Sequence, residues 1–295
     1  MGLVVSALKV VAKAIPQLSV PLTVVLTVAK LVDLITKKKH GPNPIVEQLR
    51  ETIMTDNPLR ERWPYPMTPD VWPTEDEFNR AMSMIQEGQQ FHFGVSGVVK
   101  SGKSSLLNSF RGLAKTDPGA AKVGSSETTV GITRYNDPRP DYPFAWYDIA
   151  GFGTASAPAH SYFNSHGLFA LDCILILIRD SFQESDASLL KQCRSLSIPT
   201  YLVRSFSDQR ISSILEDGAS SYEEARAEFI HDAEENMRNG LRDFGLGEQR
   251  VYLINSRAML ALVRGRTPMP DTIIHEAELL RDVLQECRER RFRNI

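Results

Sequence analysis

Short apolar runs alternate with amphipathic stretches from about residue 90 to residue 254. Runs of this length that are rich in Val, Ile, Leu and aromatic residues are typical of buried strands. The predicted strands are residues 90–95, 132–135, 144–147, 173–178, 200–203 and 251–254, and helices are predicted at 103–112, 187–195 and 222–243. Strands that alternate with helices in this way predict an α/β fold with a mostly parallel, doubly wound sheet.

Further helices are predicted on both sides of this alternating region. Residues 41–73 are rich in proline but include a helical stretch at 45–54. Thr74 to Glu77 has the sequence of a capping box and predicts a helix that runs to about Glu87. Near the other end, a helix is predicted from Asp271 to about Arg291. Its basic end (RERRFRNI) suits the helix dipole and is expected to be a solvated tail.

The first 40 residues differ from the rest, because Val, Leu, Ala and Ile dominate them and three lysines close them. The uncharged stretch at 14–29 is shorter than the roughly 20 residues that a spanning helix needs, and two prolines interrupt it. Polar residues at helical spacing lie on one face, which is typical of a helix at a membrane interface. They are Ser6, Lys9, Lys13 and Gln17. We expect residues 1–40 to bind a membrane surface, and the alternative is a pair of helices that packs on the protein's own core.

The chain also begins with a signal for lipid attachment. Its first residues fit M-G-x-x-x-[ST], with Gly2 as the acceptor of an N-myristoyl group. One acyl chain gives only marginal membrane binding, so the apolar segment and Lys37 to Lys39 would supply the second signal. A cytoplasmic protein that associates peripherally with a membrane is therefore expected.

Composition narrows the possible functions. The chain has 295 residues and a net charge of −2, so no global field recruits nucleic acid, and only the short basic tail would favour such a partner. Cys173, Cys193 and Cys287 lie far apart without a C-x-x-C pair, which argues against a zinc site. We expect them to be reduced and mostly buried.

A phosphate-binding motif follows the first predicted strand. Residues 97–104 (GVVKSGKS) fit G-x-x-x-x-G-K-[ST] at every fixed position and stand between a predicted strand and a predicted helix. Backbone N–H groups of such a loop point at phosphates, and side chains at the glycines would block that approach. We expect Lys103 to clamp the β- and γ-phosphates and Ser104 to bind Mg²⁺. The predicted nucleotide-binding residues of this loop are Gly97, Lys100, Ser101, Gly102, Lys103, Ser104 and Ser105.

Two later segments would complete a magnesium and γ-phosphate site. Asp148 to Gly151 has the form D-x-x-G after a predicted strand, so Asp148 would hold Mg²⁺ through water and the Gly151 N–H would contact the γ-phosphate. A threonine from the preceding segment would complete the metal ligands, and Thr129 is preferred over Thr128. The predicted catalytic residues are Lys100, Lys103, Thr129 and Gly151, and the predicted metal ligands are Ser104, Thr129 and Asp148.

The base-binding residues are expected after the last two predicted strands. Asp208 of Ser205-Phe206-Ser207-Asp208 fits the carboxylate of [NT]-K-x-D, which accepts the N–H groups of guanine. Phe206 replaces the lysine of that motif, so guanine preference is weakened. The ring could stack on the purine or pack in the core. Ser256, within Asn255 to Arg257, stands where a short loop would lie behind the base.

Taken in order, these motifs resemble those of the immunity-related GTPases, which are interferon-inducible in vertebrates. The resemblance covers roughly residues 75–260 and rests on GVSGVVKSGKSSLLNSFRGL, AAKVGSSETTVGITRY, FAWYDIAGFGT, CILILIRDSFQESD and YLVRSFSD. It implies a Ras-like P-loop GTPase domain with a small helical appendage formed by both chain ends. It also implies GTP or GDP with Mg²⁺ as ligands and a nucleotide-dependent homodimer that remodels membranes. The expected domains are an apolar segment at 1–40, a helical connector at 41–89, the GTPase domain at 90–258 and a C-terminal helical segment at 259–295.

Departures from the family pattern leave alternatives open. Phe152 stands where Ras-like enzymes have a water-positioning glutamine, so slow intrinsic hydrolysis is expected. Lys100 occupies the place of an internal arginine finger in some dynamin-like GTPases, where it would neutralise phosphate charge, or it is a solvated lysine. The rival functions are a non-catalytic nucleotide-binding scaffold and an ATPase, for which the strand that ends at Asp180 imitates a Walker B motif.

Overall fold

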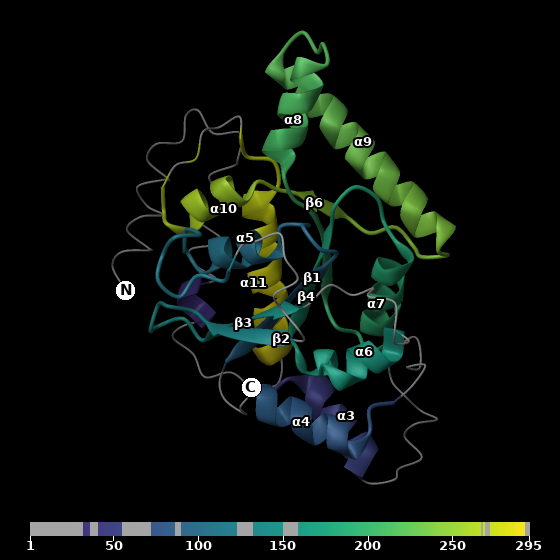
Figure 1. Cartoon of the computed structure of the whole chain (residues 1–295). Helices are drawn as coiled ribbons and strands as arrows, with labels where there is room; N and C mark the ends of the chain where they lie inside the picture. Colours follow the sequence, from purple (N-terminus) through teal and green to yellow (C-terminus); the bar gives the residue numbers. More distant parts are fainter. Residues whose placement is uncertain are drawn as a thin grey trace.

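The computed structural model describes residues 32–35, 41–54, 72–85, 90–122, 132–149, 159–266, 268 and 272–292. A six-stranded sheet forms its centre, with strand order β2-β3-β1-β4-β5-β6 (Figure 1). Neighbouring strands are parallel except for the antiparallel pair β2 and β3. The strands are β1 (Phe91–Gly97), β2 (Ile132–Asn136), β3 (Phe144–Ile149), β4 (Cys173–Ile178), β5 (Thr200–Arg204) and β6 (Val251–Leu253). The predicted α/β fold with a mostly parallel sheet is confirmed.

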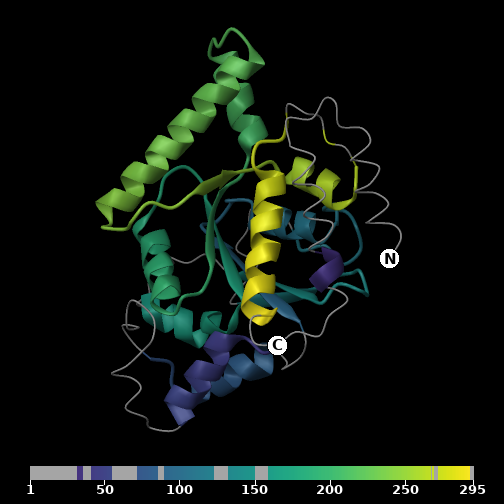
Figure 2. The same ribbon diagram turned by 180° about the vertical axis from the view of Figure 1, so that it is seen from behind.

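Helices cover both faces of this sheet because side chains of each strand alternate between two apolar cores. Ile174 and Ile176 of β4 belong to one core, and Leu175 and Leu177 belong to the other. The first core is covered by α3 (Pro44–Met54), α4 (Glu75–Ile85), α6 (Ala159–Ser165), α7 (Glu184–Ser195) and α9 (Tyr222–Asp243). The second core is covered by α5 (Lys103–Phe110), α10 (Ser256–Val263) and α11 (Glu276–Phe292), and Figure 2 shows α11 lying along the sheet.

Most elements begin and end close to the predicted residues. The capping box at the start of α4 is present, since the Glu77 N–H donates to Thr74 Oγ1 at 3.2 Å and the Thr74 N–H donates to Glu77 Oε2 at 2.8 Å. Three short α-helices of the described residues were not predicted, namely α6, α8 (Ser207–Glu216) and α10, and neither was the 3-10 helix at Leu168–Ala170. Both α8 and α10 begin inside segments that were predicted to be base-binding loops.

The basic end of α11 is not the solvated tail that was expected. Arg291 is buried, and its Nε and Nη2 donate to the two oxygens of Asp172 at 2.7 and 2.6 Å. The same guanidinium also donates to the carbonyl oxygens of Gly41 at 3.1 Å and Gln90 at 3.0 Å. These bonds fasten the end of α11 to the residue before β4, to the residue before β1 and to the segment that leads into α3. The prediction of a solvated tail was therefore wrong at Arg291.

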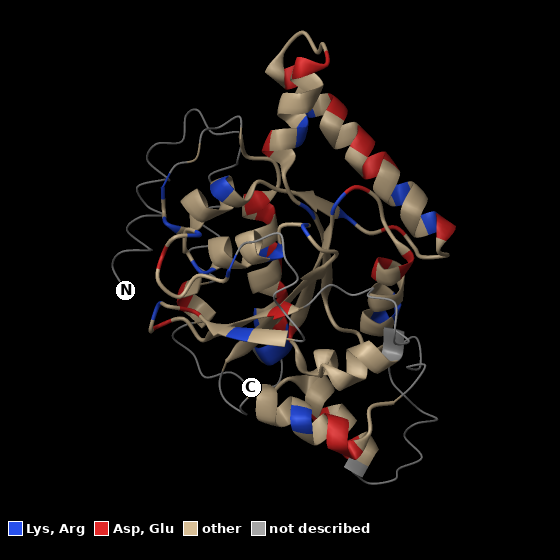
Figure 3. Cartoon of the chain, in the orientation of Figure 1, with Lys and Arg blue, Asp and Glu red and all other residues tan. Residues whose placement is uncertain are grey.

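Charges of both signs lie on the outer helices, including α4 and α9 (Figure 3). Among the described helices, none is long and apolar enough to cross a membrane. Cys173, Cys193 and Cys287 are all buried and free, as predicted.

Candidate functional site

The turn between β1 and α5 has a backbone that favours glycine at two positions. Gly97 has φ +142°, and a Cβ on it would lie 2.3 Å from the carbonyl oxygen of Leu177 in β4. Gly102 has φ +91° and is the N-cap of α5. Lys100, exposed between them, also adopts positive φ, at 65°. The motif therefore forms a tight strand-turn-helix unit, which is the arrangement that phosphate-binding loops need.

The Lys103 side chain folds back across this turn. Its Nζ donates to the carbonyl oxygens of Gly97 at 2.9 Å and Val98 at 3.0 Å. Burial lowers the pKa of the Lys103 ammonium, and the nearby carboxylate of Asp148 partly offsets this effect. The loop thus holds a partly buried cation, whose attraction for phosphate oxygens is stronger than that of a fully exposed one.

Ser104 and Asp148 form a pair of oxygen donors next to this cation. Ser104 Oγ donates to Asp148 Oδ2 at 2.8 Å, and Asp148 lies within β3, opposite Val95 of β1. Burial raises the pKa of Asp148, while the Ser104 hydrogen bond and the Lys103 charge lower it. The predicted strand ended at residue 147, but β3 continues to Ile149, so Asp148 lies inside the strand rather than just beyond it.

A hard oxygen pair of this kind suits Mg²⁺, which prefers carboxylate, hydroxyl, water and phosphate oxygens. In the part of the chain that the structure describes, no three His, Cys, Asp or Glu side chains gather as a metal cluster. A cation at Ser104 and Asp148 would therefore take further oxygens from phosphate and water. The predicted residues Thr129 and Gly151, with Thr128 and Phe152, lie outside the described residues.

The segment after β5 contacts the phosphate loop directly. Ser205 Oγ donates to the carbonyl oxygen of Ser101 at 2.5 Å. Phe206 has φ 62° and is the N-cap of α8, and its Cζ lies 3.2 Å from where a Cβ on Gly102 would be. The ring therefore lies against the phosphate loop and belongs to neither apolar core. Asp208 follows in the first turn of α8 and is partly exposed.

The segment after β6 begins a helix rather than a loop. Asn255 is the N-cap of α10, and its side chain accepts the Arg257 N–H at 2.8 Å. The carbonyl oxygen of Ser256 accepts a hydrogen bond from Ser109 Oγ of α5 at 2.7 Å. Ser109 Oγ also donates to the carbonyl oxygen of Ser105 at 2.8 Å. The predicted binding residues Ser105 and Ser256 thus share the Ser109 hydroxyl as a hydrogen-bond partner. The structure thus joins the predicted base-binding turn to the phosphate-loop helix.

Sequence reasoning missed the residue that holds this turn from the other side. Glu276 is fully buried at the start of α11, and its two oxygens accept the N–H groups of Asn255 at 2.6 Å and Ile274 at 2.7 Å. Burial raises the pKa of Glu276 to about 7. In the sequence it is one of several acidic residues near a helix start, and no motif includes it.

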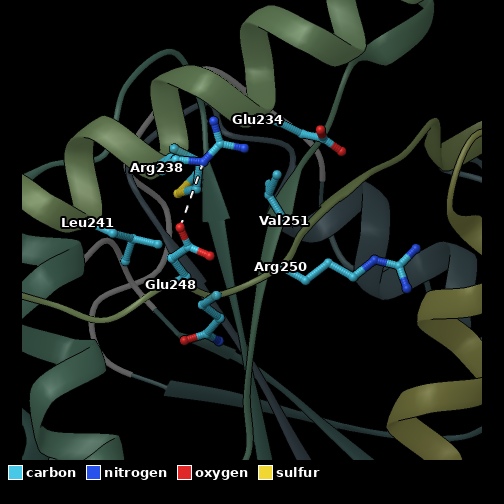
Figure 4. A pocket seen from close by; sticks show the side chains of 8 residues that line it. Glu234, Arg238, Leu241, Glu248, Arg250 and Val251 are labelled. Carbon is cyan, nitrogen blue, oxygen red and sulfur yellow. Dashed lines mark ion pairs between the residues drawn. The ribbon is translucent and has the colours of Figure 1, made fainter.

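A separate cavity of about 260 Å³ lies between α9 and the segment that enters β6 (Figure 4). It is lined by Glu234, Met237, Arg238, Leu241, Glu248, Gln249, Arg250 and Val251. Arg238 Nε and Glu248 Oε1 are 4.0 Å apart across it, and both side chains are largely exposed. None of the predicted nucleotide-binding residues lines this cavity.

Comparison with known proteins points to one family. Residues 75–262 match the sequence profile described as interferon-inducible GTPase (IIGP). Interferon-inducible GTPase 1 of Mus musculus is 26% identical over 163 residues, which cover 55% of this chain and 39% of that protein. T-cell-specific guanine nucleotide triphosphate-binding protein 2 of Mus musculus is 26% identical over 188 residues, which cover 62% of this chain and 45% of that protein. The match thus spans less than half the length of these curated relatives.

One solved structure similar to this chain is a nucleotide complex from a plant. The crystal structure of Toc33 from Arabidopsis thaliana in complex with Mg²⁺ and GMPPNP is 14% identical, with a TM-score of 0.44. The alignment covers 74% of this chain and 93% of that chain.

Proposed function

The chain belongs to the interferon-inducible GTPase family, and on that premise we propose that it binds GTP with Mg²⁺ and hydrolyses it to GDP and phosphate. The observation that carries the proposal is the phosphate loop itself. Its two positive-φ glycines, the partly buried Lys103 ammonium and the Ser104 to Asp148 hydrogen bond of 2.8 Å all lie around one turn. This combination supplies backbone N–H groups, a cation and metal-binding oxygens for a nucleoside triphosphate.

The residues of the chain then have distinct tasks. Lys103 binds the β- and γ-phosphates, and the helix N-terminus at Gly102 adds its partial positive charge. Ser104 and Asp148 hold Mg²⁺, which supplies charge neutralisation on the triphosphate. Thr129 and Gly151 are proposed to complete the metal and γ-phosphate contacts. Lys100 is proposed as an internal cation on the phosphates, and slow hydrolysis follows from Phe152 in the water-positioning place.

Base recognition is proposed to rest on Asp208 and on the turn at Ser256. A carboxylate in the first turn of α8 can accept the two N–H groups of guanine's Watson–Crick edge, which adenine does not offer in that arrangement. Phe206 packs on Gly102 and contributes an apolar ring instead of a charged side chain. Guanine selectivity is therefore proposed to depend mainly on the carboxylate.

The direct experiment is a calorimetric titration of the nucleotide-free protein with GTP, GDP and ATP in the presence of Mg²⁺. We expect GTP and GDP to bind more tightly than ATP, and Asp208→Asn to abolish that preference. Lys103→Ala should abolish binding of all three, whereas Lys115→Ala, at an exposed lysine just beyond α5, should not change it. Unchanged affinity of Lys103→Ala would refute the site.

The proposal also includes attachment to a membrane and self-association. The N-terminal segment at 1–40, chiefly residues 1–31 because Ile35 packs in the core, is proposed to hold the protein peripherally on a membrane facing the cytoplasm. A myristoyl group on Gly2 would add to this attachment, and GTP-bound copies would form a homodimer there. Single-turnover hydrolysis with and without liposomes tests this together with catalysis. A rate that never exceeds the uncatalysed background would leave a non-catalytic nucleotide-binding scaffold as the function.

A further inference from the structure

A buried carboxylate lies next to the proposed base-binding turn but belongs to no nucleotide-binding motif. Glu276 has a relative exposure of 0%, and its oxygens accept the N–H groups of Asn255 at 2.6 Å and Ile274 at 2.7 Å. Asn255 follows β6 in the chain, and Ile274 precedes α11. The side chain thus bridges two backbone segments that lie on either side of α10 in the sequence.

The first of these segments is the turn that would lie behind the purine. Asn255 caps α10 by accepting the Arg257 N–H, so its backbone orientation sets the position of Ser256 between them. Ser109 of α5 fixes the carbonyl oxygen of Ser256 at 2.7 Å. The turn is therefore held from the phosphate-loop helix on one side and from Glu276 on the other.

Packing alone does not explain a carboxylate at this place. Burying an ionisable group costs free energy, and an apolar side chain of similar size would fill the same space without that cost. It would, however, leave the N–H groups of Asn255 and Ile274 without the acceptors that Glu276 now supplies. What the carboxylate provides is a fixed direction for two backbone N–H groups.

We propose that Glu276 is a positioning residue of the purine pocket, which holds the turn at 255–257 against the base without contacting the nucleotide. The inference rests on the proposed function, because the turn has a ligand only if the phosphate loop holds a guanine nucleotide. Helix α11, which follows all the nucleotide-binding motifs in the sequence, would then contribute to the affinity for the base. Phosphate binding should not depend on Glu276 directly, because the hydrogen bonds that it accepts come from Asn255 and Ile274 and not from Lys103 or Ser104.

The test compares a ligand that has a base with one that lacks it. GTP and inorganic tripolyphosphate, each with Mg²⁺, are titrated calorimetrically into the full-length protein, Glu276→Gln and Glu276→Asp. Glutamine keeps one acceptor oxygen and presents an NH₂ group to the second N–H, so we expect GTP affinity to fall about tenfold while tripolyphosphate affinity is unchanged. Aspartate keeps the carboxyl group but is one methylene shorter, and it should show the same selective loss.

The comparison separates positioning from general stability. A parallel fall for both ligands would mean that Glu276 only stabilises the fold, and unchanged GTP affinity would mean that it does not act on the turn. Either result overturns the inference while leaving the proposed function intact. If Glu276→Gln does not fold, Glu276→Asp gives the same comparison. Failure of the unaltered protein to bind either ligand would overturn the proposed function first and this inference with it.

Discussion

Among the glycines that the structure describes, Gly97 leaves the least room for a side chain. Its φ of +142° is unfavourable for other residues, and a Cβ would lie 2.3 Å from the Leu177 carbonyl oxygen, which belongs to the sheet and cannot move aside cheaply. We expect Gly97→Ala to lower the free energy of unfolding by about 2–4 kcal/mol in urea denaturation. Gly245→Ala is the control, since φ is +68° there but nothing lies within 4 Å. It should cost only about 1 kcal/mol, and equal losses at both glycines would contradict the steric argument.

Ser104 gives a prediction about the metal. Its hydroxyl contacts Asp148 at 2.8 Å and suits a Mg²⁺ ligand, whereas the phosphate contacts of Lys103 do not require the ion. We expect Ser104→Ala to lower GTP affinity by about 10- to 100-fold in Mg²⁺, corresponding to roughly 1.4–2.8 kcal/mol. In EDTA its affinity for GDP should equal that of the unaltered protein. Ser83→Ala, at an exposed serine of α4 whose hydroxyl donates only within its own helix, serves as the control. A loss that is the same with and without Mg²⁺ would remove Ser104 from the metal site.

Glu276 also makes stability depend on pH. Its pKa is raised from 4.5 in the unfolded chain to about 7 in the folded protein, so the folded state holds the proton more firmly between these values. The free energy of unfolding should therefore fall as pH rises from about 4.5 to 7, by about 3 kcal/mol from this group. Urea denaturation of the unaltered protein and Glu276→Gln across that range measures the difference. Asp186, whose burial raises its pKa to about 6, contributes the same slope to both proteins. Parallel curves would show that Glu276 does not titrate in this range.

At the scale of elements, a buried ion pair fastens the C-terminal end of α11 to the sheet. Arg291 and Asp172 are both about 3% exposed at their side chains and make two hydrogen bonds of 2.7 and 2.6 Å. Removing one partner leaves a buried charge without compensation, which typically costs 3–5 kcal/mol. We expect Arg291→Met to lose about this much stability in urea denaturation, and Asp172→Asn/Arg291→Met to lose less than the sum of the single variants. Arg288→Met, at a partly exposed arginine of the same helix, should change stability little.

Elements with long, regular patterns could be predicted from the sequence, and short ones could not. The apolar run of β4 and the helical spacing of α9 predict their bounds at the same residues as the structure. The helices α8 and α10 have only 10 and 8 residues, and each begins at motif residues that also suit a loop. Their start is decided by Phe206 in the left-handed region and by the Asn255 cap, which are matters of three-dimensional packing.

At the scale of the whole molecule, some site residues could likewise be predicted from the sequence and others could not. The phosphate loop is contiguous, so its residues could be identified from spacing alone, and Asp148 could be placed beside it because parallel strands end at one edge. Glu276 reaches Asn255 across 21 positions in the chain, and Arg291 reaches Asp172 across 119. No spacing rule links such pairs, because their meeting depends on how α11 packs against the sheet.

The membrane role of the N-terminal segment can be tested by deletion, because its described residues at 32–35 pack in the core of the protein. Ile35 is 1% exposed and packs in the core beneath α11, whereas residues 1–31 lie outside the described structure. Deleting residues 1–31 should leave the thermal unfolding temperature nearly unchanged and abolish liposome co-sedimentation. Deleting residues 1–40 removes Ile35 as well and should cost a further 2–3 kcal/mol, which is typical of losing a buried aliphatic side chain. If the shorter deletion destabilises the protein as much as the longer one, residues 1–31 pack on the core, because only a segment that contributes to folding can lower stability when it is removed.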